Sequence, residues 1–394
     1  MMSWLRSLFS RARRTTGGPS CRLRVEQLEG RVVPAGVIAV GSGAGVTGRV
    51  ALFHDSNNDG VPDGFSYATF NVFGDFTGGV RVAVGDFVGD SNLELAAATG
   101  PGAGRLLIFH LDANGAPTGT PEQIEPFGSS FTHGLNIARA RTGGAAHASL
   151  VVAADAGGEP QVAVYSDDTA TGGATPGDGL LANSRVDSFL AFGPAFRGGV
   201  RLAAGRNLTA GDVSDTVALA TGPGVVAHVR IVKDANNDFR LSDNLSAAET
   251  LFPVGDSWTG GLFVALGDVG SPSANAELVV GRGAGSAPRV FIFTDANNNG
   301  LYGDDHGPAS TFLAFDPSLR VGVHPVATRL SPAAVNLQGE LMVAPGPGAP
   351  LQVRVYKAAS NGEIGPTTTP LAKFFPLEFG FTAGYSVAFG GNGS

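Results

Sequence analysis

A glycine-flanked apolar motif recurs along most of the chain. It is clearest at Gly79–Gly85, where the sequence reads GVRVAVG, and weaker copies follow at a nearly constant interval. Self-similarity at a fixed period indicates a repeat architecture, in which each unit buries its apolar faces against its neighbours. The spacings between successive motifs are 55, 65, 62, 61 and 62 residues. The motifs begin at Gly79, Gly134, Gly199, Gly261, Gly322 and Gly384.

Each repeat contains four short strand-like runs. The motif is followed by a second apolar run that ends in a glycine turn, as in LELAAATGPGAG from 93 to 104. A third run ends at an aromatic or apolar residue, and a fourth ends near a spaced pair such as Phe73 and Phe76. Short apolar runs separated by Gly and Pro turns predict antiparallel strands. Four strands per repeat are typical of a β-propeller blade.

The two ends of the repeat region complement each other. The last motif, Gly384–Gly390, is a first strand without followers, whereas the repeat region begins with a second strand at Val37. Together they supply one four-stranded sheet and close the ring without an unpaired edge. The sequence therefore predicts an all-β, six-bladed β-propeller of four-stranded antiparallel blades over residues 36–394. It is closed by pairing of the C-terminal strand with the N-terminal strands.

Composition supports a folded chain. Gly 59 and Pro 24 among 394 residues would suit a disordered protein, but hydrophobic residues make up 43% and charged residues only 15%. This is enough apolar material for a core divided among many short strands. The single cysteine, Cys21, excludes an intrachain disulfide framework and a cysteine metal cluster.

Charge is distributed unevenly along the chain. The first 34 residues hold seven arginines and two acidic residues, which leaves 19 basic and 32 acidic residues in the rest. We predict that residues 1–35 form a disordered basic leader for export, although they lack the uninterrupted apolar segment of an ordinary secretory signal. The acidic remainder should repel nucleic acid and anionic lipid, so no nucleic-acid partner is expected. No apolar run is long enough to predict a membrane span.

One glycine turn matches a nucleotide-binding pattern. Gly43, Gly45 and Gly48 form G-x-G-x-x-G directly after a strand-like run. A dinucleotide site needs a helix after these glycines, because the helix N-terminus holds the pyrophosphate. The residues that follow, Arg49–Phe53, alternate like a strand, and similar glycine turns recur in the other repeats. We therefore interpret the pattern as a hairpin turn.

The cadence of the repeats resembles a known family. The stretch GGVRVAVGDF, followed by an acidic loop and a TGPG turn, is similar to the FG-GAP repeats of integrin-α-like propellers and bacterial surface proteins over residues 36–394. The leader stretch 26–34, EQLEGRVVP, resembles the Leu-Glu-x-Arg signature of exported planctomycete proteins. The resemblance implies calcium between the first and second strands of a blade. Here it points to Asp86, Asp90 and Glu94, with Val88 where that family has asparagine.

Three loops between predicted third and fourth strands are rich in Asp and Asn. Residues 55–63 match D-x-N-x-D-G-x-x-D in full, and oxygen side chains at alternate positions can converge on calcium while the glycine allows a sharp turn. Asp, Asn and Gly are also good turn residues, and integrin-type propellers do not hold their metal here. Calcium is favoured for the first loop, and either interpretation accounts for the other two, whose last acid is displaced by one position. The candidate ligands are Asp55, Asn57, Asp59 and Asp63; Asp234, Asn236, Asp238 and Asp243; and Asp295, Asn297, Asn299 and Asp304.

No other residue pattern predicts catalysis. The seven histidines lack metal-ligand spacing and are interpreted as polar residues at strand ends, and no G-x-S-x-G elbow occurs. Trp258 takes the repeat position of Phe76, which predicts a place between blades. Of the tyrosines not assigned to strands, only Tyr302 falls in a long loop, so no aromatic platform for sugars is visible.

We predict an exported or cell-surface, calcium-binding propeller that acts as a non-catalytic binding or adhesion scaffold. Its ligand would be a protein or a polysaccharide, presented with variable loops such as 112–126 and 166–185, and the protein would be monomeric. The alternative is a carbohydrate-binding or carbohydrate-active propeller, lyase-like or hydrolase-like, with its site at the central channel.

Overall fold

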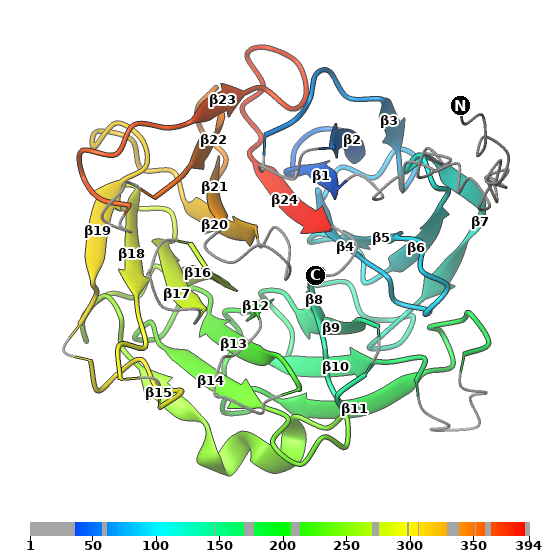
Figure 1. Cartoon of the computed structure of the whole chain (residues 1–394), viewed down its shortest axis with the longest axis horizontal. Helices are drawn as coiled ribbons and strands as arrows, with labels where there is room; N and C mark the ends of the chain where they lie inside the picture. Colours follow the sequence, from blue (N-terminus) through cyan, green and yellow to red (C-terminus); the bar gives the residue numbers. More distant parts are fainter. Residues whose placement is uncertain are drawn as a thin grey trace, which may run out of the picture. The chain divides into compact units, whose positions relative to one another are not determined.

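The strands of this chain form six blades arranged in a ring (Figure 1). Within the described residues, 24 strands pair into six sheets of four antiparallel strands each. This confirms the predicted six-bladed β-propeller. The computed structural model describes residues 36–56, 61–145, 147–168, 177–205, 213–269, 276–297, 299–305, 307–328, 339–350, 352–358 and 364–390. The predicted leader, residues 1–35, lies outside these ranges.

The first three blades are numbered here along the chain, and each is given in its order of strand pairing. Blade 1 consists of β24 (Tyr385–Gly390), β1 (Gly36–Ser42), β2 (Arg49–Asp55) and β3 (Ala68–Asn71). Blade 2 consists of β4 (Val80–Gly85), β5 (Glu94–Thr99), β6 (Leu106–Leu111) and β7 (Pro117–Ile124). Blade 3 consists of β8 (Leu135–Ala140), β9 (Ser149–Ala154), β10 (Gln161–Tyr165) and β11 (Arg185–Leu190).

The other three blades repeat this order. Blade 4 consists of β12 (Val200–Gly205), β13 (Thr216–Thr221), β14 (Val229–Lys233) and β15 (Glu249–Leu251), with the short 3-10 helix η1 (Ser242–Ala247) before β15. Blade 5 consists of β16 (Leu262–Gly267), β17 (Glu277–Arg282), β18 (Arg289–Phe293) and β19 (Ser310–Leu313). Blade 6 consists of β20 (Val323–Thr328), β21 (Glu340–Pro345), β22 (Val353–Tyr356) and β23 (Ala372–Phe374).

Blade 1 closes the ring. Its first strand, β24, comes from the C-terminal part of the chain and pairs antiparallel with β1, with Ala39 opposite Ala388 and Val37 opposite Gly390. The predicted joining of the two ends is confirmed. One predicted loop is corrected, because β7 occupies most of residues 112–126 and extends the sheet of blade 2.

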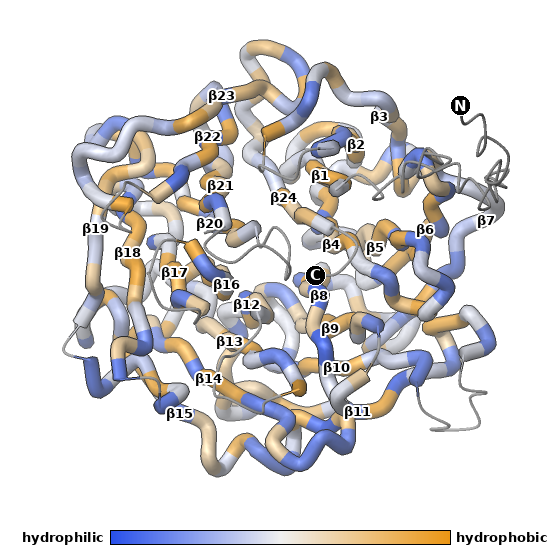
Figure 2. The backbone as a smooth tube through the Cα atoms, viewed as in Figure 1, coloured by the Kyte–Doolittle hydropathy of each residue, from blue (hydrophilic) through white to orange (hydrophobic). Residues whose placement is uncertain are grey.

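Each blade buries both of its faces. Successive side chains of a strand point to opposite faces, so an apolar second strand such as β5 can be buried at every position, as it is here. The buried apolar residues fall into six clusters, and each cluster joins residues of two adjacent blades, with Leu95 facing blade 1 and Leu106 facing blade 3. Hydrophobic residues accordingly follow the strands in Figure 2. The core is therefore divided among the gaps between neighbouring blades.

The glycine turns link one blade to the next. Gly102 adopts φ +112°, and its N–H donates a hydrogen bond of 2.8 Å to the carbonyl of Thr132 at the entry to blade 3. Only glycine adopts such a backbone conformation without strain. The turn at Gly45 does the same toward Thr77, and β2 follows it as a strand, which confirms that the G-x-G-x-x-G stretch is a hairpin. The remaining pairs are Gly157 to Arg197, Gly224 to Thr259, Gly285 to Arg320 and Gly348 to Thr382.

Acids on outer strands clamp the loop of the following blade. The carboxylate of Glu122 on β7 accepts hydrogen bonds from the N–H groups of Leu181 and Ala182, at 3.0 and 2.6 Å. Leu181 is fully buried in the cluster between blades 2 and 3. Two further blade pairs repeat this arrangement, which we call the outer clamp. In these, Asp187 accepts from Leu241 and Ser242, and Glu249 accepts from Tyr302 and Gly303.

The glycine turn gives the first testable prediction. Gly102→Ala should lower the free energy of unfolding by about 1–3 kcal/mol, because alanine is strained at this φ and its Cβ would lie 3.3 Å from the Phe76 ring. Chemical denaturation measures the change. Gly64→Ala is the matched control, since no atom lies within 4 Å of its added Cβ, and it should stay within about 0.5 kcal/mol. An equal loss of unfolding free energy in the two variants would contradict the structural role of the glycine turn at Gly102.

Candidate functional site

The inner strands of the six blades line a central channel. They are β4, β8, β12, β16, β20 and β24, and they enclose a cavity of about 250 Å³. A second cavity of about 180 Å³ lies against the glycine turns of blades 4, 5 and 6. The two cavities share Arg201, Phe263 and His324. These three residues therefore lie where the two cavities meet.

The repeat places one residue of each blade at this level of the channel. It is the third residue of the glycine-flanked motif, and all six copies line the larger cavity. Two are arginines, three are other polar residues and one is aromatic. In blade order from blade 2 they are Arg81, Asn136, Arg201, Phe263, His324 and Ser386. Each blade thus offers one side chain to the channel from the same backbone position, and five residue types occur among the six.

Asp155 connects the two arginines of this ring. It lies in the hairpin turn of blade 3, is 2% exposed, and accepts a 2.6 Å hydrogen bond from Arg201. The guanidinium of Arg81 approaches the same carboxylate at 3.6 Å from the other side. Burial opposes ionisation of Asp155, but Arg201 and Arg81 outweigh it and lower the pKa of the carboxyl group. Burial also disfavours the charged form of Arg81, and for a guanidinium this lowers the pKa.

Aromatic rings extend this cluster on the other side of Arg201. The Arg201 guanidinium lies over the Phe263 ring at 5.3 Å, and the His324 ring stacks on Phe263 with centroids 3.6 Å apart. Burial, and then the nearby charges of Arg81 and Arg201, lower the pKa of His324 to about 3. His324 is therefore neutral at physiological pH. His324 lies at the start of β20, as expected of a histidine at a strand end, but its stacking on Phe263 in the channel was not expected from the sequence.

The channel is cationic although the chain outside the leader is acidic. Near the opposite end of β8, Asp215 holds the backbone N–H of Arg141 at 2.8 Å, and burial lowers the pKa of Arg139. Among the described residues, four arginines and two aspartates line the cavity. They are Arg81, Arg139, Arg141, Arg201, Asp215 and Asp268. The surplus of positive charge suits an anionic ligand.

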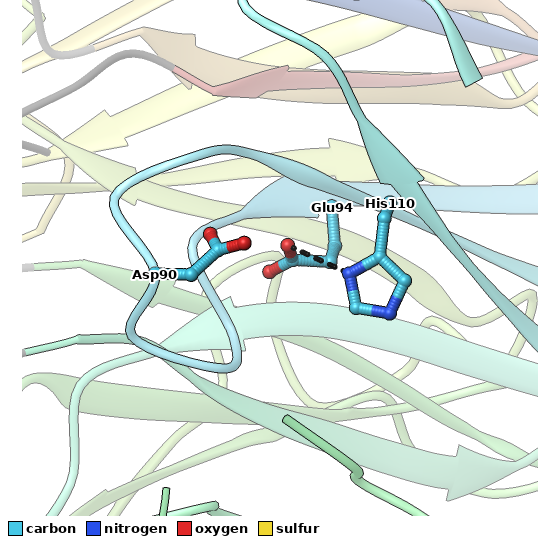
Figure 3. A group of neighbouring side chains, drawn as sticks. All are labelled: Asp90, Glu94 and His110. Carbon is cyan, nitrogen blue, oxygen red and sulfur yellow. Dashed lines mark ion pairs between the residues drawn. The ribbon is translucent and has the colours of Figure 1, made fainter. Parts of the chain in front are cut away.

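The predicted calcium residues of blade 2 separate into two groups. Asp86 turns into its own loop, accepting from the N–H groups of Gly89 and Ser91. Asp90 and Glu94 instead approach His110, so that ligand atoms of all three lie within 4.8 Å of one another (Figure 3). An imidazole nitrogen is a poor calcium ligand, because calcium takes oxygen. The geometry of this group therefore gives calcium little support.

Glu94 is a structural anchor in this group. One oxygen accepts a 2.7 Å hydrogen bond from the N–H of Phe87, and the other lies 3.4 Å from His110 Nδ1. Burial raises the pKa of Glu94 to about 8, against the opposing effect of the Phe87 hydrogen bond. Blade 6 has an ion pair at the same position, Glu340 with Lys357 at 3.2 Å. We interpret both pairs as contacts that fasten the loop to the blade.

The Asp/Asn loop of blade 5 brings its predicted calcium ligands together. Asn297 and Asn299 both donate from their amide groups to Asp304, at 3.2 and 2.6 Å. Asp295 accepts from the N–H groups of Asn299 and Gly300 at the base of the loop. The side-chain oxygens of Asn297 and Asn299 accept hydrogen bonds from the N–H groups of Asn299 and Leu301, so both amides would have to turn to present oxygen to a cation beside Asp304. The donor set, two carboxylates and two amides, consists of oxygen ligands that suit calcium.

The other two Asp/Asn loops show part of the same arrangement. In blade 4, Asn236 donates to Asp243 at 2.9 Å, and Asp234 accepts from the N–H of Asp238 and, across the blade gap, from that of Gly143. In blade 1, Asp55 is buried, and Asp63 accepts from the N–H of Ser56 at 2.6 Å. Asn57 and Asp59, the other predicted ligands of blade 1, lie outside the described residues.

Two aromatic residues of the sequence analysis now have a place. Tyr302, the tyrosine of a long loop, is 2% exposed and donates its hydroxyl to the carbonyl of Ala276, so it offers no platform for a sugar. Trp258 packs against the cluster between blades 4 and 5, as predicted, and Arg282 lies over its ring at 5.3 Å.

The sequence analysis did not predict the channel cluster, which consists of Arg81, Asp155, Arg201, Phe263 and His324. The sequence nevertheless contains a signal for it. Asp155 takes the place of a turn glycine that is Gly100 in blade 2 and Gly222 in blade 4. Arg81 and Arg201 are likewise variable residues within otherwise regular motifs. Residues that depart from the repeat at equivalent positions would have identified the cluster.

Comparisons with known proteins yield similar structures only. No protein-family model matches the sequence, and no curated protein matches it. Among solved structures, the chain is similar to the Dos1 propeller, with 11% identity and a TM-score of 0.42, over 87% of this chain and 69% of that one. It is also similar to Sqt1 from Chaetomium thermophilum, with 15% identity and a TM-score of 0.40, over 89% and 71% of the two chains.

The class of protein follows from the strand pairing of this chain itself, which defines a six-bladed β-propeller. None of the helices in the described residues is long and apolar enough to cross a membrane.

The buried histidine gives a prediction about pH. The pKa of His324 falls from 6.5 to about 3 on folding, so between these values the unfolded chain binds a proton that the folded one does not. The contribution of His324 to the free energy of unfolding is fully present above pH 6.5 and is lost as the pH falls toward 3. In His324→Phe, the melting temperature should therefore fall less steeply than in the wild type as the pH is lowered from neutral. Parallel pH profiles for the two proteins would contradict this.

Proposed function

We propose that this protein is an exported or cell-surface, calcium-binding β-propeller that acts as a non-catalytic binding or adhesion scaffold. A rigid ring with loops at its rim is the kind of framework on which binding residues are usually carried. Its ligand would be a protein or a polysaccharide, bound by a monomer. The resemblance of the repeats and the leader to exported surface proteins supports this location.

The observation that carries the calcium proposal is the convergence of the predicted ligands in the blade 5 loop. Asp295, Asn297, Asn299 and Asp304 would hold the ion there, since the amides of both asparagines already lie within 3.2 Å of Asp304. Extracellular calcium modules bind with dissociation constants of about 10⁻⁴–10⁻³ M. A loop of this kind would therefore be occupied outside the cell and largely empty in cytoplasm.

Calcium in this loop would stiffen the contact between two blades. Between Asn299 and Asp304 the loop carries Tyr302 and Gly303, whose N–H groups are held by Glu249 of blade 4. Tyr302 itself is buried in the cluster between blades 4 and 5. An ion that fixes both ends of the loop would hold this buried residue in place and so strengthen the ring.

The channel cavity favours a second candidate function, carbohydrate binding or carbohydrate chemistry at the channel. A cavity lined by polar groups that converge from several blades is a typical small-ligand site. The groups that converge at its glycine-turn side are two arginines around one carboxylate, which suit binding better than acid–base catalysis.

Calcium should raise the melting temperature of the purified protein. At about 100-fold above the dissociation constant, a single site adds about 2.7 kcal/mol to the free energy of unfolding, which corresponds to a rise of several degrees. Asp304→Asn should reduce this rise, because it removes one carboxylate from the proposed ligands. Differential scanning calorimetry with chelator or excess calcium, together with calcium titration calorimetry, measures the effect.

The control is Asp256→Asn, which makes the same charge change at an exposed position outside the Asp/Asn loops. It should keep the full response to calcium. If wild type shows neither heat on titration nor a shift of melting temperature, calcium binding fails. If Asp304→Asn responds as strongly as Asp256→Asn, the ion does not bind in the blade 5 loop.

A further inference from the structure

Around Arg81 and Arg201, the part of the channel wall formed by the third motif residues has more hydrogen-bond donors than acceptors. The two guanidinium groups have about ten N–H donors between them. Among the described residues, the only hydrogen bond found for these donors is the one from Arg201 to Asp155. Arg81 has no hydrogen-bond acceptor in that part of the chain, and its nearest carboxylate oxygen is 3.6 Å away. Guanidinium donors that have no acceptor among the described residues and face the cavity are available to a ligand with oxygen acceptors.

The net charge of the cluster formed by Arg81, Arg201 and Asp155 also favours an anionic ligand. Two arginines face one aspartate, and His324 beside them is neutral, so the cluster has a net charge of about +1. Asp155 lies in the turn of blade 3, between Arg81 of blade 2 and Arg201 of blade 4, and pairs with both guanidinium groups. The side chains of Arg81 and Arg201 remain 25% and 16% exposed, and both line the cavity. A ligand in the channel can therefore reach them.

The cavity limits the size of the ligand. Its volume of about 250 Å³ lies just below the usual range of ligand pockets, which is roughly 300–1,000 Å³. Phe263 and His324 close one side, with their rings stacked on each other. Asn136 of blade 3, whose amide nitrogen donates to the carbonyl of Val200, also lines the cavity. The space suits a molecule of about the size of a monosaccharide rather than a polymer chain.

We propose that the central channel binds a small oxyanion-bearing molecule, whose carboxylate or phosphate group is held between Arg81 and Arg201. Guanidinium groups bind both kinds of oxyanion through paired N–H donors, and a low-dielectric cavity strengthens such contacts. This inference goes beyond the proposed scaffold function, because it concerns the channel rather than the Asp/Asn loops, and it needs no calcium.

Titration calorimetry in the presence of chelator tests the inference with four probes: acetate, glucuronate, inorganic phosphate and glucose. We expect binding of at least one oxyanion that weakens with added salt, and no binding of glucose. A response to acetate or glucuronate alone identifies a carboxylate site, and a response to phosphate alone identifies a phosphate site. No heat with any oxyanion, or glucose binding equal to that of glucuronate, overturns the proposal.

Arg81→Gln is the decisive variant. It keeps the ion pair of Arg201 with Asp155 but removes the net positive charge, so affinity should fall by about tenfold or more. Arg49→Gln is the matched control, because Arg49 of β2 forms an exposed ion pair with Glu378 and is not among the residues that line the channel. Unchanged affinity in Arg81→Gln overturns the proposal.

Asp155→Asn provides an opposite test. It removes the carboxylate that competes with the ligand, so binding should become tighter. Circular dichroism and the melting temperature first show whether this variant folds. If it does not fold, the comparison of Arg81→Gln with Arg49→Gln decides alone. If it folds and binds more weakly than the wild type, the proposed role of the two arginines is wrong.

Discussion

The pairing of β24 with β1 is the contact on which the rest of the structure depends. In the part of the chain that the structure describes, no blade has a core of its own, because the six apolar clusters all lie between neighbouring blades. A blade is stable only if both neighbours are present, and that condition is met everywhere only in a closed ring. The four-stranded sheet of blade 1 combines the two distant ends of the repeat region. Without this pairing, blades 6 and 2 would each face an incomplete neighbour.

Two kinds of polar contact hold the blades at a fixed spacing. On the side of the glycine turns, a backbone N–H such as that of Gly102 reaches the entry of the next blade. At the outer strands, a carboxylate such as Glu249 holds the loop that inserts a buried residue between blades. These contacts use backbone groups on one side, so they tolerate variation in the loop sequence. The ring can then keep its geometry while individual loops and channel residues change.

Much of the fold could be predicted from the sequence because its signals are local and repeated. The run LELAAAT, for example, forms β5 at the predicted place, and the incomplete repeats at the two ends combine as expected. The channel cluster could not be predicted in this way. Asp155 and Arg201 are 46 residues apart and meet only because two blades pack side by side. The burial of Tyr302 likewise depends on Glu249 in another blade, which no pattern within its own loop indicates.

The most direct test of ring closure is a disulfide between β1 and β24 in a chain without its natural cysteine. Ala39 and Ala388 are opposite each other in the pairing, within the distance that a disulfide can bridge. In a Cys21→Ser protein, Ala39→Cys with Ala388→Cys should form an intramolecular disulfide under mild oxidation, identified by peptide mass spectrometry. Ala39→Cys with Ala220→Cys, which joins blades 1 and 4, should not. Failure of the first pair to form a disulfide in the folded protein, or equal cross-linking of both pairs, would contradict the closed ring.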